Sequence, residues 1–213
     1  MNAGIQRKEL EIAKAEKPNL SQYNKEVNGL SAIDWLEKGN ALGIDGRNQE
    51  AIEAFTKAVE LNPNDALAYY NRGQAYDNLG DYRQAIRDCD KAIELDPKYA
   101  LAYLNRGAAY GKLGDQRRAI RDFDRTIELD SKEVKAYHNR GISYSILGDY
   151  RQAIRDFDRT IELDPKNAKA YGNRGISYSI LGNHPQAIED FKNAARLGSK
   201  DAQDFLRSKG INW

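Results

Sequence analysis

The sequence is poor in cysteine and histidine, which supply disulfides and many metal ligands. Among its 213 residues Cys89 is the single cysteine, which excludes an intramolecular disulfide and a cysteine-based metal cluster. The two histidines, His138 and His184, lie far apart and lack neighbours at metal-ligand spacing. No set of reactive side chains converges at a recognisable spacing either. We therefore expect no metal, no cofactor and no catalytic residue, and so a protein that is not an enzyme.

Neither sign of charge is in clear excess, and long apolar runs are missing. The chain has 33 Lys and Arg against 32 Asp and Glu, a net charge of +1. Nucleic-acid binding relies on a surplus of basic residues, so we expect no nucleic-acid partner. No apolar run is long enough to span a bilayer, and the first residues are charged where a signal peptide is apolar. These features favour a cytoplasmic protein, or a periplasmic one if a signal peptide has been removed.

What the sequence does contain is a repeat of 34 residues. The segment AIRDFDRTIELD occurs at 119–130 and, unchanged, at 153–164, and NRGISYSILG occurs at 139–148 and 173–182. Both pairs are offset by 34 residues, and no insertion or deletion interrupts the period. The period defines five repeats, which span residues 32–65, 66–99, 100–133, 134–167 and 168–201.

Each repeat is predicted to form two helices. In the second repeat, apolar and small residues recur at helical spacing in both halves. Between the halves, Gly80 can end the first helix in the left-handed conformation, and Asp81 can cap the second helix with Gln84 completing a capping box. The second helix ends at Asp96 because Pro97 follows, and Pro97 can begin the next helix.

These positions, numbered from the start of each repeat, resemble the tetratricopeptide repeat family. Its pattern is an aromatic residue at position 4, Gly at 8, Tyr at 11, Gly at 15, Ala at 20, an aromatic residue at 24, Ala at 27 and Pro at 32. The second repeat matches it at Tyr69, Gly73, Tyr76, Gly80, Ala85, Cys89, Ala92 and Pro97, with Cys89 as the departure. The resemblance covers 170 residues and implies an all-α, right-handed α-solenoid of five helix-turn-helix hairpins. The phrases NRG, LGDY and ELDP are also similar to those of bacterial proteins of this type.

The two ends of the chain lie outside the five repeats. Residues 202–213 place Phe205 at the position-4 site of a sixth repeat, and we expect them to form a C-terminal capping helix. Residues 1–31 form a leader for which a short helix, partial disorder and docking elsewhere all remain open. In the docking alternative, Ile5, Leu10 and Ile12 lie in the groove of the same chain or of a neighbouring one.

Charged residues recur at two positions that the helical pattern turns inward. Position 7 holds arginine in repeats two to five, and position 23 holds aspartate in the same repeats. A half-buried guanidinium is costly unless it is paired, and a carboxylate in the same hairpin can pair with it bidentately. Pairing between neighbouring repeats would set Arg72 against Ala54, so we expect pairing within each repeat.

The resemblance implies that ligands lie along the concave surface of the first helices, at positions 2, 5, 6, 9, 12 and 13. Asparagine at position 6 can donate to and accept from a peptide backbone. Apolar residues at the other positions exceed what the hairpin core needs, and lysine at position 2 favours carboxylates in the partner. The predicted peptide-binding residues are Asn71, Asn105, Asn139, Asn173, Leu101, Leu104, Lys135, Ile142, Ile146, Lys169, Ile176 and Ile180.

Three kinds of function fit this sequence. The first is a non-catalytic scaffold or adaptor that binds a peptide or protein segment in the groove. The alternative is a structural self-assembly subunit whose groove takes a terminus of a neighbouring copy. An accessory subunit of an enzyme would have the same sequence features. Cys89 is expected to be a packing residue in each case.

Overall fold

The computed structural model describes residues 29–213, which contain eleven helices and no strand. The predictions for the leader, including docking of Ile5, Leu10 and Ile12, concern residues 1–28 and lie outside the described part. The chain divides into one compact unit that ends at Asn64 and another that spans Asp65–Trp213.

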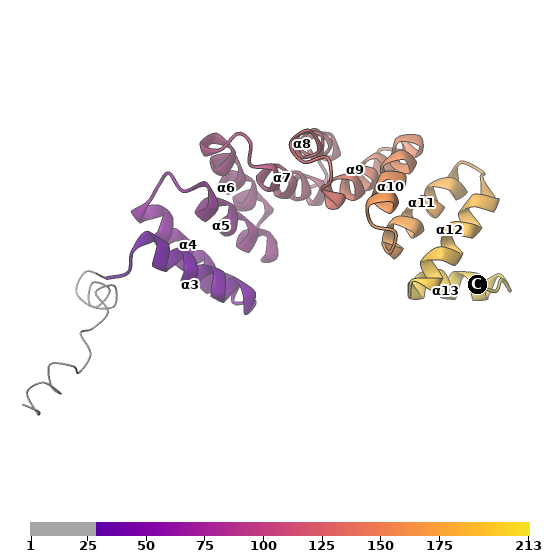
Figure 1. Ribbon diagram of the computed structural model, residues 1–213, viewed down its shortest axis with the longest axis horizontal. Coiled ribbons are helices and arrows are strands. Elements are labelled where there is room, and N and C mark those ends of the chain that lie inside the picture. The colour runs from indigo at the N-terminus through magenta and orange to yellow at the C-terminus, as the bar shows by residue number, and fades with distance from the viewer. Residues whose placement is uncertain (1–28) are drawn as a thin grey trace, which may run out of the picture. The chain divides into compact units, whose positions relative to one another are not determined.

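The first compact unit holds one helical hairpin, in which α3 (Ala32–Ile44) packs against α4 (Asn48–Leu61). The second holds four further hairpins and a last helix (Figure 1). These helices are α5 (Ala66–Asn78), α6 (Tyr82–Leu95), α7 (Ala100–Lys112), α8 (Gln116–Leu129), α9 (Val134–Ile146), α10 (Tyr150–Leu163), α11 (Ala168–Ile180), α12 (His184–Arg196) and α13 (Lys200–Ser208).

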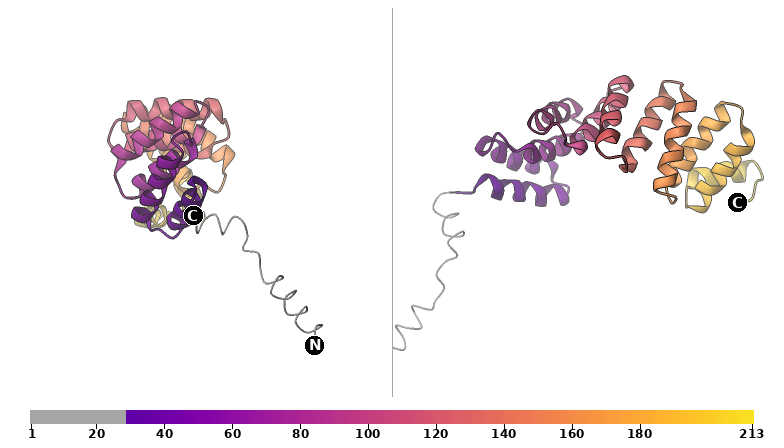
Figure 2. Two further views of the ribbon diagram at one scale, coloured as in Figure 1. Left: turned by 90° about the vertical axis from the view of Figure 1, so that its left-hand side faces the viewer. Right: turned by 45° about the horizontal axis from the view of Figure 1, so that its top comes forward.

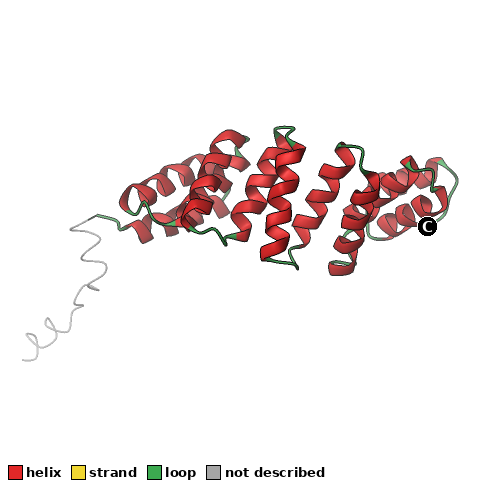
Figure 3. Ribbon diagram, turned by 90° about the horizontal axis from the view of Figure 1, so that it is seen from above, coloured by secondary structure: helices red, strands yellow, loops and turns green. Residues whose placement is uncertain are grey.

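Within Asp65–Trp213 the helices pack in chain order. The two helices of each hairpin pack together, and the second helix of each hairpin packs against the first helix of the next. The four hairpins therefore lie side by side, and α13 packs on α12 at the end of the series (Figures 2 and 3). This arrangement confirms the predicted all-α solenoid, in which each hairpin buries its apolar face against its neighbours.

A glycine ends the first helix of each hairpin. In the second compact unit these glycines have φ between 79° and 87°, in the left-handed region that favours glycine. The amide of Asp81, which follows Gly80, donates to the carbonyl of Tyr76 over 3.0 Å and satisfies a carbonyl at the helix end. The predicted conformation of Gly80 is confirmed.

The caps of the second helices are simpler than predicted. Asp81 accepts a hydrogen bond from the Gln84 amide (3.1 Å), but the Gln84 side-chain oxygen accepts from Nε of Arg87 (2.9 Å) instead of returning to the cap. The same arrangement occurs in α10, and the cap of α12 makes no side-chain hydrogen bond. A complete capping box forms at α3, between Ser31 and Asp34. The capping box predicted for Asp81 is half formed because the arginine takes the glutamine oxygen.

The sequence predicted that Pro97 begins the next helix, but α7 begins at Ala100 and Pro97 lies in the turn between α6 and α7. The amide of Tyr99 donates to the Asp96 carbonyl (3.1 Å), and the amide of Lys98 donates to the Asp96 side chain (2.9 Å). These bonds place Pro97 at the second position of a β-turn, where its fixed φ is favourable.

The C-terminal helix α13 begins and ends earlier than the predicted 202–213. It starts at Lys200 because Ser199 caps it and accepts from the Ala202 amide over 3.4 Å. It ends before Gly210, whose φ of 68° turns the chain back. Leu206 is fully buried against alanines of α12, so the helix covers the apolar end of the last hairpin.

Small residues on the first helices make room for rings on the second helices. A Cβ added at Gly141 would lie 2.8 Å from the buried ring of Phe157, and the same holds for Gly107 and Phe123. In the second repeat Cys89 stands in place of the ring and is buried. Burial raises the pKa of its thiol to about 12. Cys89 is therefore a packing residue, as predicted.

We expect the Cys89 thiol to react slowly with iodoacetamide in the native protein. The thiolate is the reactive form, and both burial and the raised pKa suppress it. Mass spectrometry after labelling at mildly alkaline pH, with and without urea, measures the rate. Labelling should require unfolding, and native labelling as fast as that of N-acetylcysteine would show that the site is open.

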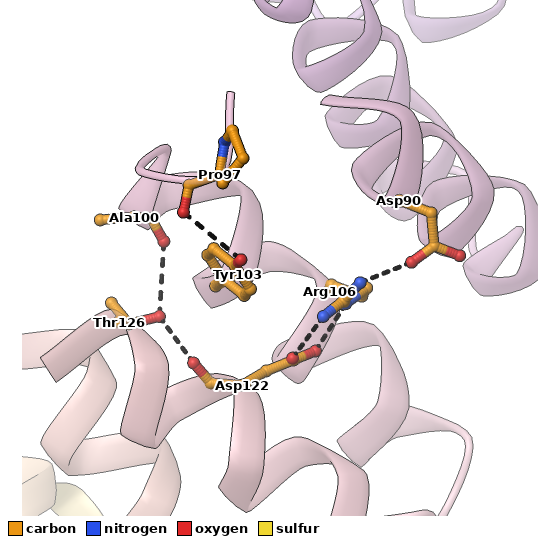
Figure 4. A network of polar contacts seen from close by, with 7 residues as sticks. All are labelled: Asp90, Pro97, Ala100, Tyr103, Arg106, Asp122 and Thr126. Carbon is orange, nitrogen blue, oxygen red and sulfur yellow. Dashed lines mark hydrogen bonds and ion pairs between the residues drawn. The ribbon is translucent and has the colours of Figure 1, made fainter. Parts of the chain in front are cut away.

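The position-7 arginines are the centres of polar networks, and Figure 4 shows the one around Arg106. Nε and Nη2 of Arg106 donate to the two carboxylate oxygens of Asp122 in the same hairpin, over 2.8 and 2.7 Å. Nη1 donates to Asp90 of the preceding hairpin over 2.6 Å. The predicted bidentate pairing is confirmed here and at Arg72–Asp88, Arg140–Asp156 and Arg174–Asp190.

The contact with the preceding hairpin was not predicted. The sequence argument considered position 23 as the cross-hairpin partner, whereas the observed partner stands at position 25, in Asp90, Asp124 and Asp158. Arg106, Arg140 and Arg174 therefore each join their own hairpin to the one before it.

Arg140→Ala should lower the free energy of unfolding by about 3–5 kcal/mol, because it leaves the Asp156 carboxylate buried without its cation. Urea denaturation followed by circular dichroism measures the change. Arg155→Ala removes an exposed arginine from the same hairpin and should change the free energy by less than about 0.5 kcal/mol. Equal effects of the two variants would contradict a structural role for the ion pair.

Candidate binding groove

The first helices α9 and α11, together with α12 and α13, line an open groove of about 840 Å³. Two smaller hollows, of about 270 and 240 Å³, share Ile142 with it and also include Ile146. The predicted site residues in the wall of the main groove are Lys135, Asn139, Ile142, Lys169, Asn173, Ile176 and Ile180.

An apolar strip runs along the groove. The side chains of Ile176 and Ile180 are 51% and 54% exposed, although both belong to a helix whose buried face is formed by smaller residues. Phe205 of α13 extends the strip and lies edge-on to Phe191 of α12, with ring centroids 4.8 Å apart. The hairpin core does not require these isoleucines, so the strip is an apolar surface that is exposed beyond the needs of the fold.

The groove opens where the sequence has glycine at position 5. The second and third hairpins carry Tyr70 and Leu104 at this position, and both side chains are buried. The fourth carries His138 and the fifth Gly172, and a Cβ added at Gly172 would meet no atom within 4 Å. Gly172 therefore leaves space in the fifth hairpin that larger residues fill elsewhere.

Leu104 is not a groove residue, and its prediction as a binding residue is wrong. It is 5% exposed and packs with Ala119 and Phe123 of its own hairpin and with Ala136 of the next. A leucine at position 5 is long enough to reach these neighbours and joins the core instead of facing solvent.

The asparagines at position 6 do not form one uniform surface. Asn139 and Asn173 line the groove on neighbouring first helices. The Asn105 side chain hydrogen bonds to Tyr70, and both Asn105 and Asn71 lie outside the groove. Leu101, on α7, is exposed but also lies outside it. The structure thus brings two of the four predicted asparagines together with the apolar strip.

Positive charge in the groove comes from Lys135 and Lys169, which are exposed at the beginnings of α9 and α11. Asp201 of α13 also lines the groove. The half-buried His138 has its pKa lowered by burial and by the charge of Lys169. Its Nδ1 is buried without a hydrogen-bond partner, and its ring centroid lies 5.8 Å from that of Phe157. His138 is therefore a neutral part of the wall at pH 7.

Sequence reasoning missed Phe191, Phe205 and Gly172 as parts of the groove wall. The repeat pattern assigns the two aromatic residues to packing. Position 5 is one of its ligand positions, but a glycine there has no side chain to contact a ligand. A comparison of position 5 among the repeats was the one available signal, since it changes from tyrosine to glycine along the chain.

Metal sites and membrane-spanning helices are both absent from residues 29–213. No group of three His, Cys, Asp or Glu side chains in this range is arranged to hold a metal ion. The helices of the same range are too short or too polar to cross a bilayer.

Three family models of the tetratricopeptide repeat match the chain. One matches residues 66–99 and 134–167, a second matches 89–121 and 157–189, and a third, described as a TPR repeat, matches 39–80. The chain belongs to the tetratricopeptide repeat family, whose fold is known for protein–protein interaction.

Solved structures of the same fold are similar over most of the chain. A structure of MamA is 28% identical and covers 78% of this chain and 96% of its own, with a TM-score of 0.71. YrrB, described as a TPR protein with an unusual peptide-binding site, is 25% identical over 89% of this chain and 97% of its own, with a TM-score of 0.72. MamA of Desulfovibrio magneticus RS-1, at 23% identity, covers 78% of this chain and 94% of its own, with a TM-score of 0.73. No curated protein matched the chain.

Gly172→Phe should fill the groove without unfolding the protein, because the space beyond this Cβ is open. Replacing a glycine within a helix also favours folding, since even alanine is more favourable than glycine there by roughly 0.5–1 kcal/mol. Methyl NMR should show ring-current shifts at Ile176, and urea denaturation should show stability at least equal to that of wild type. Gly141→Ala, whose Cβ would meet Phe157 at 2.8 Å, is the control that should destabilise. A loss of stability in Gly172→Phe as large as in this control would contradict the open space.

Proposed function

We propose that the protein is a non-catalytic scaffold that holds an extended segment of another protein in the groove of α9, α11 and α13. The observation that carries this proposal is the exposed apolar strip of Ile176 and Ile180 within a groove of about 840 Å³. Apolar strips of this kind, beyond the needs of the core, mark contact surfaces.

The groove offers three kinds of contact to such a segment. The isoleucines and Phe205 accept apolar side chains. The amides of Asn139 and Asn173 can each donate to and accept from a peptide backbone, at equivalent positions of two neighbouring helices. Lys135 and Lys169 attract carboxylates. The partner segment is therefore extended and contains both apolar and acidic residues.

The energies are consistent with moderate affinity. Burying an isoleucine side chain contributes roughly 1.5–3 kcal/mol, so a few such contacts can offset the ~4–15 kcal/mol cost of association. The description of YrrB as a protein with an unusual peptide-binding site supports a peptide-binding role for a chain of the same fold.

The test uses a peptide selected from a random library on the wild-type protein. We expect Ile176→Asp combined with Ile180→Asp to weaken its binding by about 100-fold or more, because two apolar contacts of ~1.5–3 kcal/mol each are lost. Isothermal titration calorimetry measures the affinity. The control combines Ile33→Asp with Ile44→Asp, which changes two exposed isoleucines of α3 and should leave the affinity unchanged.

Circular dichroism must show both double variants to be folded. Unchanged affinity in the folded groove variant would place the contact on another surface. Light scattering tests for self-association. If wild type is an oligomer and the groove variant is a monomer, the groove binds a second copy of this chain and the scaffold proposal is wrong.

A further inference from the structure

Exposed arginines form a band on the second helices of three consecutive hairpins. They stand at positions 18 and 22, one helical turn apart, on α6, α8 and α10. The six residues of this arginine band are Arg83, Arg87, Arg117, Arg121, Arg151 and Arg155, and all are exposed.

Within residues 29–213 the charges of the band act on carboxylates without forming ion pairs, as those of Arg121 and Arg155 do on Asp115 and Asp156. In residues 29–213, every arginine outside the band takes part in an ion pair with a carboxylate, and none of the six in the band does so. Arg87 and Arg155 contact only the neutral side chains of Gln84 and Gln152. The band is therefore a local source of positive potential in a chain whose net charge is +1.

Folding does not account for these arginines. Position 18 is in the first turn of its helix, where the helix dipole disfavours a positive charge. The band also has limits in the sequence. The same two positions hold Gln49 and Glu53 in the first repeat, and Pro185 and Glu189 in the fifth. At these two positions arginine is thus restricted to the three central repeats, a pattern that no contact within residues 29–213 explains.

A hollow of about 870 Å³ lies between α6 and α8 within the band. Arg83 and Arg87 line one side of it, and Arg117 and Arg118 line the other. Asp90 and Asp115 also line the hollow, but each is paired, Asp90 with Arg106 and Asp115 with Arg118. The remaining arginines therefore supply the free charge of this hollow. Several guanidinium groups therefore face one open space that a ligand can enter.

We propose that the arginine band binds an acidic segment of a partner protein, at a site separate from the groove. The planar guanidinium binds carboxylates bidentately. The two arginine rows are only about 6 Å apart along the helices, at 1.5 Å per residue. Acidic residues border them on both sides: the capping aspartates of position 16, such as Asp81, and the aspartates of position 25, such as Asp90.

The narrow shape of the arginine band determines which kind of polyanion can bind to it. A single acidic polypeptide strand can follow a positive strip between two negative rows. A nucleic-acid duplex or an anionic membrane extends beyond the strip and brings its own negative charge onto the bordering aspartates. The charge pattern therefore favours carboxylates on a polypeptide over the wider polyanions.

The experiment uses fluorescent poly-L-glutamate as the probe and the full chain as the protein. Its test variant replaces position 22 in all three hairpins: Arg87→Gln, Arg121→Gln and Arg155→Gln. The matched control replaces position 26 of the same helices: Lys91→Gln, Arg125→Gln and Arg159→Gln. The control removes the same number of positive charges, but these residues are already paired with glutamates.

Fluorescence anisotropy at physiological salt should show binding by wild type that weakens as salt is raised. The position-22 variant should bind roughly 5- to 100-fold more weakly, as expected for three lost surface ion pairs, and the control about twofold more weakly at most.

Four outcomes would overturn the proposal. They are the absence of binding at low salt, equal weakening in the position-22 and position-26 variants, tighter binding of single-stranded oligothymidylate or of anionic phospholipid vesicles than of poly-L-glutamate, and a wild-type oligomer that the position-22 variant dissociates. The second outcome would reduce the effect to net charge, the third would make phosphate the ligand, and the fourth would make a second copy the partner. Circular dichroism confirms that both triple variants are folded.

Discussion

The guanidinium of each position-7 arginine in the last three hairpins contacts three consecutive helices. Arg140 lies on α9, makes a bidentate pair with Asp156 on α10 and donates to Asp124 on α8. A buried ion pair stabilises a fold only when its geometry is good and its donors are satisfied. Here Nε, Nη1 and Nη2 are all used, and the ring of Tyr137 lies 5.6 Å from the guanidinium carbon. One arginine side chain therefore fixes two distances, the one between the two helices of its hairpin and the one between that hairpin and the preceding hairpin.

The surface of the second compact unit depends on this fixed interior. The buried glycines, phenylalanines and ion pairs repeat with little change, so each hairpin presents its outer positions in the same places. Differences among repeats then fall at positions that the core leaves open. Position 5 changes from buried Tyr70 to Gly172, and this change opens the groove. A binding site can thus be made by removing one side chain, without altering the helices that carry it.

How much could be predicted from the sequence depended on whether both members of a contact recur at a constant spacing. The hairpins, their glycine turns and the pairs within them followed from the 34-residue period, because position 7 and position 23 vary together. The contact from Arg106 to Asp90 was missed, since position 25 is on the exposed side of its helix and its partner belongs to another repeat. Leu104 was wrongly predicted to face the groove. The family's ligand positions do not take account of side-chain length, and a leucine at position 5 is long enough to reach the core. Phe205 was assigned to packing because position 4 is a packing position of the repeat pattern, whereas in the structure Phe205 also lines the groove.

The arginine band was missed in the sequence analysis for a different reason. A net charge of +1 averages over the whole chain, while binding depends on the charge within about 10 Å of the ligand. Its six arginines are balanced in number by carboxylates, yet the bordering aspartates, such as Asp81 and Asp90, form no ion pair with them. The groove is lined by α9, α11, α12 and α13, whereas the band lies on α6, α8 and α10, so neither proposed ligand needs the residues of the other. If both sites bind segments of one partner, the second contact forms within an existing complex, and the linker sets its effective concentration. Two contacts of moderate strength would then give a stable complex, which is how a thin stack of helices without a deep pocket can hold a partner firmly.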